Sequence, residues 1–177
     1  MENREFVVEL LTKDNVVCEI RKETDRLLLV IPELKSMVGF QHCHPHHHLD
    51  VWEHTLLALS FSKNQLTTRM ALLLHDIGKP SSYQQEGNFR HYKGHAEKSV
   101  AIAEGILKRL CFEELFINEV IAFIRHHDIP LSDIEIDKSP ELSRGIFEVQ
   151  KCDALAHNPK FNQKRLSYIA KIERLMQ

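Results

Sequence analysis

The chain has 177 residues, enough for one ordinary domain with an apolar core of its own. Hydrophobic residues make up 43% and charged residues 27%, a globular balance that argues against a disordered chain. The net charge of -2 and the lack of a long Lys/Arg block argue against a broad nucleic-acid surface, and no apolar run approaches the roughly 20 residues that cross a bilayer. The acidic start MENREF does not resemble a signal peptide, so we expect a single cytoplasmic domain over residues 1–177.

Two amphipathic segments open the chain. The first is predicted as a helix over about residues 2–13, and the second as a helix over about residues 16–30 that ends before Pro32, because proline cannot continue a helix interior. We expect residues 1–38 to serve as packing helices.

The next helix is predicted to begin at Asp50, after the polar stretch QHCHPHHHL. Glu53 follows three residues later, a pair typical of a capping box, and this helix carries His54. The run LTTRMALLLHDIG has apolar residues at helical spacing and ends at Gly78. His75 therefore lies at the end of a second helix.

The segment SSYQQEGNFRHYKG is polar and is predicted as a loop. Proline and asparagine residues mark the boundaries of further helices. One of these helices is predicted to have Ser139 as its N-cap and Pro140 as its first residue. These helices are expected from His95 to about residue 110 and over about residues 113–127, 139–156 and 161–176. No strand pattern stands out, so the predicted fold class is all-α.

Histidine and aspartate recur on five separate helices or helix ends. They are His54, the pair His75 and Asp76, His95, the pair His126 and His127, and Asp153. A helical bundle can aim such side chains at one interior point and bind a divalent metal there. A carboxylate has two oxygens and can bridge two cations, so Asp76 beside His75 favours a binuclear site between the core helices.

The segments WEHTLLAL, LLLHDIGKP, YKGHAEKSV, FIRHHD and KCDALAHNP, in this order, resemble the motifs of the HD superfamily of metal-dependent phosphohydrolases. The resemblance covers residues 39–159, with residues 160–177 as a C-terminal helix, and implies a helical HD bundle. Within this superfamily, the sequence is most similar to the HD region of bacterial CCA-adding enzymes (tRNA nucleotidyltransferases) and to free-standing HDIG proteins. No glycine-serine loop followed by paired acidic residues is present, so nucleotide addition to tRNA is not carried over.

Carried over residue by residue, the resemblance makes four residues the core ligands: His54, His75, Asp76 and Asp153. His95 with His127 or His126 would complete a second site, and we prefer His127. The expected cofactors are two divalent ions of Fe, Mn, Ni, Co or Zn. Spacing leaves the choice between the two adjacent histidines open.

The resemblance also implies hydrolysis by a metal-activated water, with Asp76 and Lys79 as the catalytic residues. Lys79 is further expected to contact a phosphate, together with Arg90, Lys93 and His47. The expected partner is a small phosphorylated, nucleotide-like substrate, whereas the oligomeric state stays open. Two other functions are a non-catalytic nucleotide- or RNA-binding module and a mixed-valent di-iron oxygenase.

Several residues have simpler interpretations. Most of the histidines of residues 42–48 are expected to be solvated, with a functional role only for His47, and Asp128 is expected to stop a helix. His91 and His157 have no partner visible in the sequence. The four cysteines form no CxxC pair and are expected as reduced, mostly buried thiols.

Overall fold

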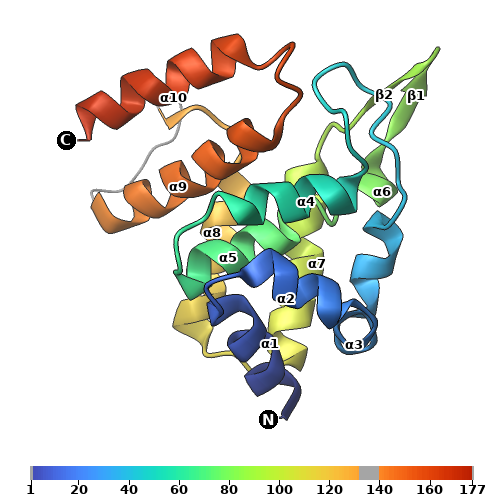
Figure 1. Cartoon of the computed structure of the whole chain (residues 1–177), viewed down its shortest axis with the longest axis vertical. Coiled ribbons are helices and arrows are strands. Elements are labelled where there is room, and N and C mark those ends of the chain that lie inside the picture. Colours follow the sequence, from blue (N-terminus) through green and yellow to red (C-terminus); the bar gives the residue numbers. More distant parts are fainter. Residues whose placement is uncertain (1, 132–139, 177) are drawn as a thin grey trace.

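The computed structural model describes residues 2–131 and 140–176, and within them the chain is a bundle of helices with one small two-stranded sheet (Figure 1). In the bundle, α7 packs on α8, α5 packs on α8 and α9, and α4 packs on α9 and α5. The core helices are α4 (Val51–Ser60), α5 (Leu66–Leu74), α7 (His95–Arg109), α8 (Glu114–His126) and α9 (Pro140–Ala156). The expected all-α class is confirmed. Ser139, the predicted cap of α9, lies outside the described residues.

The N-terminal elements brace this bundle on one side. α1 contacts α5, α2 contacts α4, and α3 contacts a 3-10 helix. These elements are α1 (Glu2–Thr12), α2 (Val16–Lys22), α3 (Thr24–Val30) and η1 (Pro32–Met37). The prediction of one helix over residues 16–30 was wrong, because the chain bends at Glu23, which lets α2 and α3 pack on different partners.

A hairpin, missed in the sequence, follows α6 (Lys79–Ser82). Strands β1 (Gln84–Glu86) and β2 (Phe89–His91) pair antiparallel. Gly87 has a φ of +58° at the turn, a conformation that glycine adopts without strain. The backbone N–H of Arg90 donates to the carbonyl of Cys43 at 3.0 Å, which ties the hairpin to the histidine-rich stretch.

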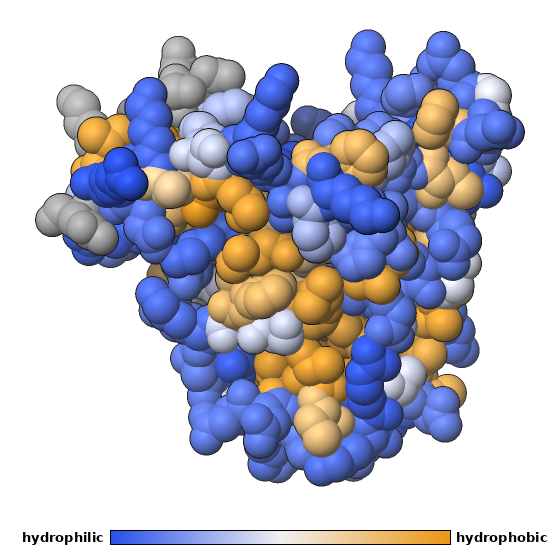
Figure 2. Space-filling view, turned by 45° about the horizontal axis from the view of Figure 1, so that its top comes forward, coloured by the Kyte–Doolittle hydropathy of each residue, from blue (hydrophilic) through white to orange (hydrophobic). Residues whose placement is uncertain are grey.

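α10 (Gln163–Leu175) extends beside α9, away from the N-terminal helices (Figure 1). Phe147 and Ala154 of α9 and Ile169 of α10 form a small core separate from the main one. Polar residues dominate the upper end of the molecule, whereas hydrophobic residues show in the middle of the face in Figure 2. Among the described helices, none is long and apolar enough to span a membrane.

The cysteine expectation was wrong in part. Cys152 is buried, but Cys18, Cys43 and Cys111 are exposed, and all four are free thiols.

Gly78 allows α7 to approach the end of the α5 segment closely. A Cβ at this position would lie 2.5 Å from the carbonyl oxygen of His95 and 2.6 Å from the backbone nitrogen of Ser99. The backbone N–H of Gly78 also donates to Ser99 Oγ at 2.9 Å. The glycine therefore sets the distance between the segment that follows α5 and the first turn of α7.

We expect Gly78→Ala to lower the free energy of unfolding by about 1–3 kcal/mol, because helix backbone would have to move to make room. Urea denaturation measures the change. Gly105→Ala is the matched control on the exposed side of α7, where an added Cβ meets nothing within 4 Å. It should be neutral or stabilise the helix by up to about 1 kcal/mol. Equal effects of the two substitutions would contradict this account of Gly78.

Candidate metal centre

His54 lies in the first turn of α4, which is fixed by its cap. Asp50 Oδ1 accepts a hydrogen bond from the backbone N–H of Glu53 at 2.8 Å, as the capping pair predicted. His54 Nδ1 lies 3.3 Å from the carbonyl oxygen of Ala156. Its Nε2 atom therefore points inward, 2.9 Å from Asp153 Oδ1.

The other three buried histidines of the centre are oriented in the same way. In each, the Nδ1 atom contacts a backbone carbonyl three residues earlier: Leu72 at 2.7 Å for His75, Tyr92 at 2.9 Å for His95, and Ile124 at 2.6 Å for His127. A carbonyl partner fixes the proton on Nδ1 and leaves the Nε2 lone pair as a free donor. Four imidazoles from four helices or helix ends thus present Nε2 to one interior region.

Asp76 lies at the centre of this region, fully buried. Its Oδ2 atom is 3.3 Å from His75 Nε2 and 3.7 Å from His54 Nε2. Its Oδ1 atom is 3.5 Å from His95 Nε2 and 3.8 Å from His127 Nε2. The carboxylate therefore divides the donors into a first cluster (His54, His75) and a second cluster (His95, His127), each facing one of its oxygens.

Asp153 joins the first cluster from the last turns of α9. Its Oδ1 atom is 2.9 Å from His54 Nε2 and 3.7 Å from His75 Nε2. The structure thus brings together all four expected core ligands, and His95 and His127 with them.

The donor atoms fit divalent cations. His75 Nε2 and both Asp76 oxygens are buried and make no hydrogen bond within the described part of the chain, although Lys79 Nζ forms an ion pair with Asp76 Oδ2 at 2.8 Å. Buried polar atoms without partners are costly, and imidazole nitrogen with carboxylate oxygen is a donor set that Mn, Fe, Co, Ni or Zn accepts.

The ionisation of the site also suits a cation. Burial raises the pKa of Asp76, but His75 and Lys79 lower it more, and the net pKa lies well below its ordinary value. Burial lowers the pKa of His54 to about 4, despite the opposing effect of Asp153. Burial would lower the pKa of His75 too, yet Asp76 and Asp153 raise it to about 10. At neutral pH the two carboxylates are ionised, and without a cation His75 takes up a second proton, on Nε2, between them; a bound cation would take the place of that proton.

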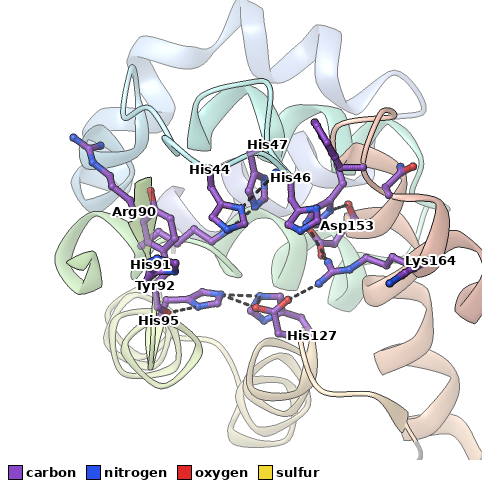
Figure 3. A pocket seen from close by; sticks show the side chains of 16 residues that line it. His44, His46, His47, Arg90, His91, Tyr92, His95, His127, Asp153 and Lys164 are labelled. Atoms are coloured by element: carbon purple, nitrogen blue, oxygen red, sulfur yellow. Dashed lines mark hydrogen bonds and ion pairs between the residues drawn. The ribbon is translucent and has the colours of Figure 1, made fainter. Parts of the chain in front are cut away.

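A cavity of about 390 Å³ is lined by His95 and His127 of the second cluster and by Asp153, which joins the first (Figure 3). Loop 38–50 and the hairpin supply one part of its wall, and α10 with the turn before it supplies another. Positively charged side chains predominate among the charged groups of the lining: Lys79, Arg90, Lys164 and Arg165 against Asp128 and Asp153. Such a cavity suits a small anion.

Only some of the expected substrate residues lie in useful positions. Lys79 and His47 line the cavity near Asp76, with 3.5 Å between Lys79 Nζ and His47 Nε2. Arg90 also lines it, but its guanidinium donates to the carbonyl of Gln41 at 2.7 Å and points away from the centre in Figure 3. Lys93 is exposed and is not among the described residues that line the cavity.

The structure distinguishes between the two adjacent histidines, His126 and His127, whereas the sequence left both as candidate ligands. His127 faces the second cluster, whereas His126 lies in neither cluster of the described residues, and its carbonyl accepts a hydrogen bond from Gln150. A helix turns by about 100° per residue, so neighbouring side chains face different directions.

Four residues near the centre were assigned no role in the sequence. His42, expected to be solvated, is buried and stacks on His47 with ring centroids 3.7 Å apart. His157 does have a partner, because its Nδ1 atom lies 2.8 Å from the carbonyl of Asp153. Arg165 and Asp128 also line the cavity. The spacing of four between Asp153 and His157 on one helix was the only usable signal.

The sequence of this chain is similar to those of known proteins. Residues 46–156 match the family model described as HD domain. The chain is 37% identical over 135 residues to the CC-adding tRNA nucleotidyltransferase of Thermus thermophilus, covering 71% of this chain and 29% of that protein. It is 28% identical over 167 residues to the A-adding tRNA nucleotidyltransferase of Deinococcus radiodurans, covering 84% of this chain and 37% of that protein. The chain thus spans about a third of the length of these relatives.

We expect His127→Ala to weaken metal binding at least ~10-fold, because it removes a donor from the second cluster. The adjacent His126→Ala variant is the control and should bind metal as the unaltered protein does. Metal content after dialysis against limiting manganese, measured by mass spectrometry, distinguishes the two. A loss in His126→Ala and none in His127→Ala would reverse the assignment.

Proposed function

The chain belongs to the HD domain family, and we propose that it is a metal-dependent phosphohydrolase acting on a small phosphate ester, with nucleotide-like compounds as the expected substrates. HD domains bind divalent metals, and the His/Asp clusters here could hold them. The observation that carries the proposal is the shared carboxylate of Asp76, which faces two donor clusters beneath a cavity with positively charged walls.

The ligands proposed for the first cation are His54, His75, Asp76 and Asp153, and those for the second are His95, His127 and again Asp76. Bound cations would supply a water of lowered pKa and neutralise charge on the phosphoryl group. The role of Asp76 is to hold its two oxygens in place between the clusters, since it is fully buried and cannot reorient into solvent.

The side chains around the clusters are proposed to bind the substrate. Lys79 Nζ lies 2.8 Å from Asp76 Oδ2, close enough to donate to a phosphoryl oxygen held at the centre. Lys164, on the opposite wall, could hold a second anionic group (Figure 3). His47, packed beside Lys79, would contact the same ester. Burial lowers the pKa of His47, so it stays neutral and adds no charge.

Two other functions compete with this proposal. The names of the relatives refer to tRNA, which favours an RNA-binding module. A module that only binds RNA does not account for the buried donor atoms without partners. The same donors could serve a di-iron oxygenase, which would consume oxygen when loaded with iron. The positive charge of the cavity favours the phosphate ester.

Asp76→Asn tests the proposal directly. We expect manganese-loaded protein to hydrolyse bis-p-nitrophenyl phosphate and the variant to lose at least ~100-fold in kcat/KM, because one preorganised charge serves both clusters. His126→Ala is the control and should keep its activity. Turnover that survives in Asp76→Asn would contradict a role for the centre in the reaction.

Removal of metal should also lower stability. A ligand that binds only the folded state at 100 times its Kd adds about 2.7 kcal/mol, so EDTA treatment should lower the Tm and added manganese should restore it. Thermal unfolding followed by circular dichroism measures this. An unchanged Tm after complete metal removal would count against a metal centre in the bundle.

A further inference from the structure

Asp128 follows His127 directly, just past the C-terminal end of α8, and lines the cavity without belonging to either donor cluster as defined above. Its Oδ2 atom lies 3.1 Å from His95 Nε2 and 3.6 Å from His127 Nε2. Asp128 therefore does more than end the helix. The carboxylate touches the free donor nitrogens of both histidines in the second cluster.

The distances match those of ligands around one cation. Bonds of about 2.0–2.2 Å place neighbouring ligand atoms roughly 2.9–3.6 Å apart, from octahedral to tetrahedral arrangements. In the second cluster, His95 Nε2 lies 3.2 Å from His127 Nε2 and 3.5 Å from Asp76 Oδ1. His127 Nε2 lies 3.8 Å from the same oxygen. Asp128 Oδ2 lies within the same range of both imidazole nitrogens, so it adds a fourth donor atom beside the other three.

The first cluster has the same composition. Asp153 Oδ1 lies 2.9 Å from His54 Nε2 and 3.7 Å from His75 Nε2, and Asp128 Oδ2 lies at the similar distances of 3.1 and 3.6 Å from its own two histidines. Each cluster thus combines two imidazoles, one oxygen of Asp76 and one oxygen of an outer carboxylate. Asp128 occupies in the second cluster the position that Asp153 occupies in the first.

One guanidinium joins the two outer carboxylates. Arg165 of α10 donates from Nη1 to Asp153 Oδ2 at 2.7 Å and from Nη2 to Asp128 Oδ1 at 3.3 Å. These are the oxygens that do not face the histidines, so the arginine leaves the inner oxygens, Asp153 Oδ1 and Asp128 Oδ2, free. Partners that hold a ligating carboxylate in this way raise metal affinity in other proteins.

We propose that Asp128 is a ligand of the second cation, together with His95, His127 and Asp76, and that Arg165 is a positioning residue for both outer carboxylates. The proposal rests on the two-cation centre of the proposed function. It makes α10, which packs mainly on α9, a part of the metal centre through a single side chain.

Manganese binding to Asp128→Asn tests the proposal. Metal-free protein is titrated with Mn²⁺ by calorimetry, and bound metal is counted after gel filtration. We expect two ions in the unaltered protein, whereas the variant should lose one ion or bind it at least ~10-fold more weakly. Asp25→Asn is the control, since it removes the same charge from an exposed position on α3. It should bind two ions unchanged.

Two ions bound to Asp128→Asn with unaltered affinity would overturn the ligand assignment alone. One ion or none in the unaltered protein would overturn the two-cation centre, and this inference with it. The melting curve of each metal-free variant shows whether it is folded. Manganese binding to Asp128→Ala gives a second, independent test of the same ligand. The side chain of Asp128 is 35% exposed at a helix end, so both variants should fold.

Arg165 is tested by a pair of variants. Arg165→Met should lower the manganese affinity of both sites. Arg165→Lys keeps the positive charge but not the two-donor guanidinium, and it should restore part of the lost affinity. A role limited to packing of α10 would lower the Tm of the metal-free protein and leave both affinities unchanged. That result would overturn the positioning role.

Discussion

The buried carboxylate of Asp76 is the constraint on which the arrangement of this bundle depends. An ionised group withdrawn from water costs several kcal/mol unless opposite charges and hydrogen-bond donors compensate it. Here the ends of α5, α7 and α8 and the first turn of α4 bring compensating side chains to its two oxygens. Lys79, three residues further along, adds a full positive charge. Helix ends are suited to this task, because a side chain there can point along the bundle into a common centre.

The remaining elements support that centre in different ways. The N-terminal helices bury the apolar faces of α4 and α5, and Gly78 lets the backbone of α7 come close enough for His95 to reach Asp76. The hairpin and α10 form the walls of the cavity above. The proposed metal ligands thus lie on the bundle, whereas most residues proposed to bind substrate lie on the less regular segments around it. Such a division lets the segments vary without disturbing the ligands.

Much of this centre could be predicted from the sequence because its signals are local. The capping pair Asp50 and Glu53 places His54, and the apolar run that forms α5 places His75 and Asp76 directly after its last residue, Leu74. Arg165 and Asp128 could not be found in that way, because packing of α10 brings residues 37 positions apart into contact. The bend at Glu23 has no proline or glycine to mark it, and the two strands have only three residues each, mostly exposed, too few for a clear alternating pattern.

The central claim is that Asp76 joins two cations. Crystals soaked in manganese and measured near the manganese absorption edge would test it most directly. The account predicts two anomalous peaks on either side of the Asp76 carboxylate, about 3.5–4 Å apart, as in other two-metal sites. One peak would come within reach of His54 and His75, and the other within reach of His95 and His127. A single peak, or none near Asp76, would contradict it.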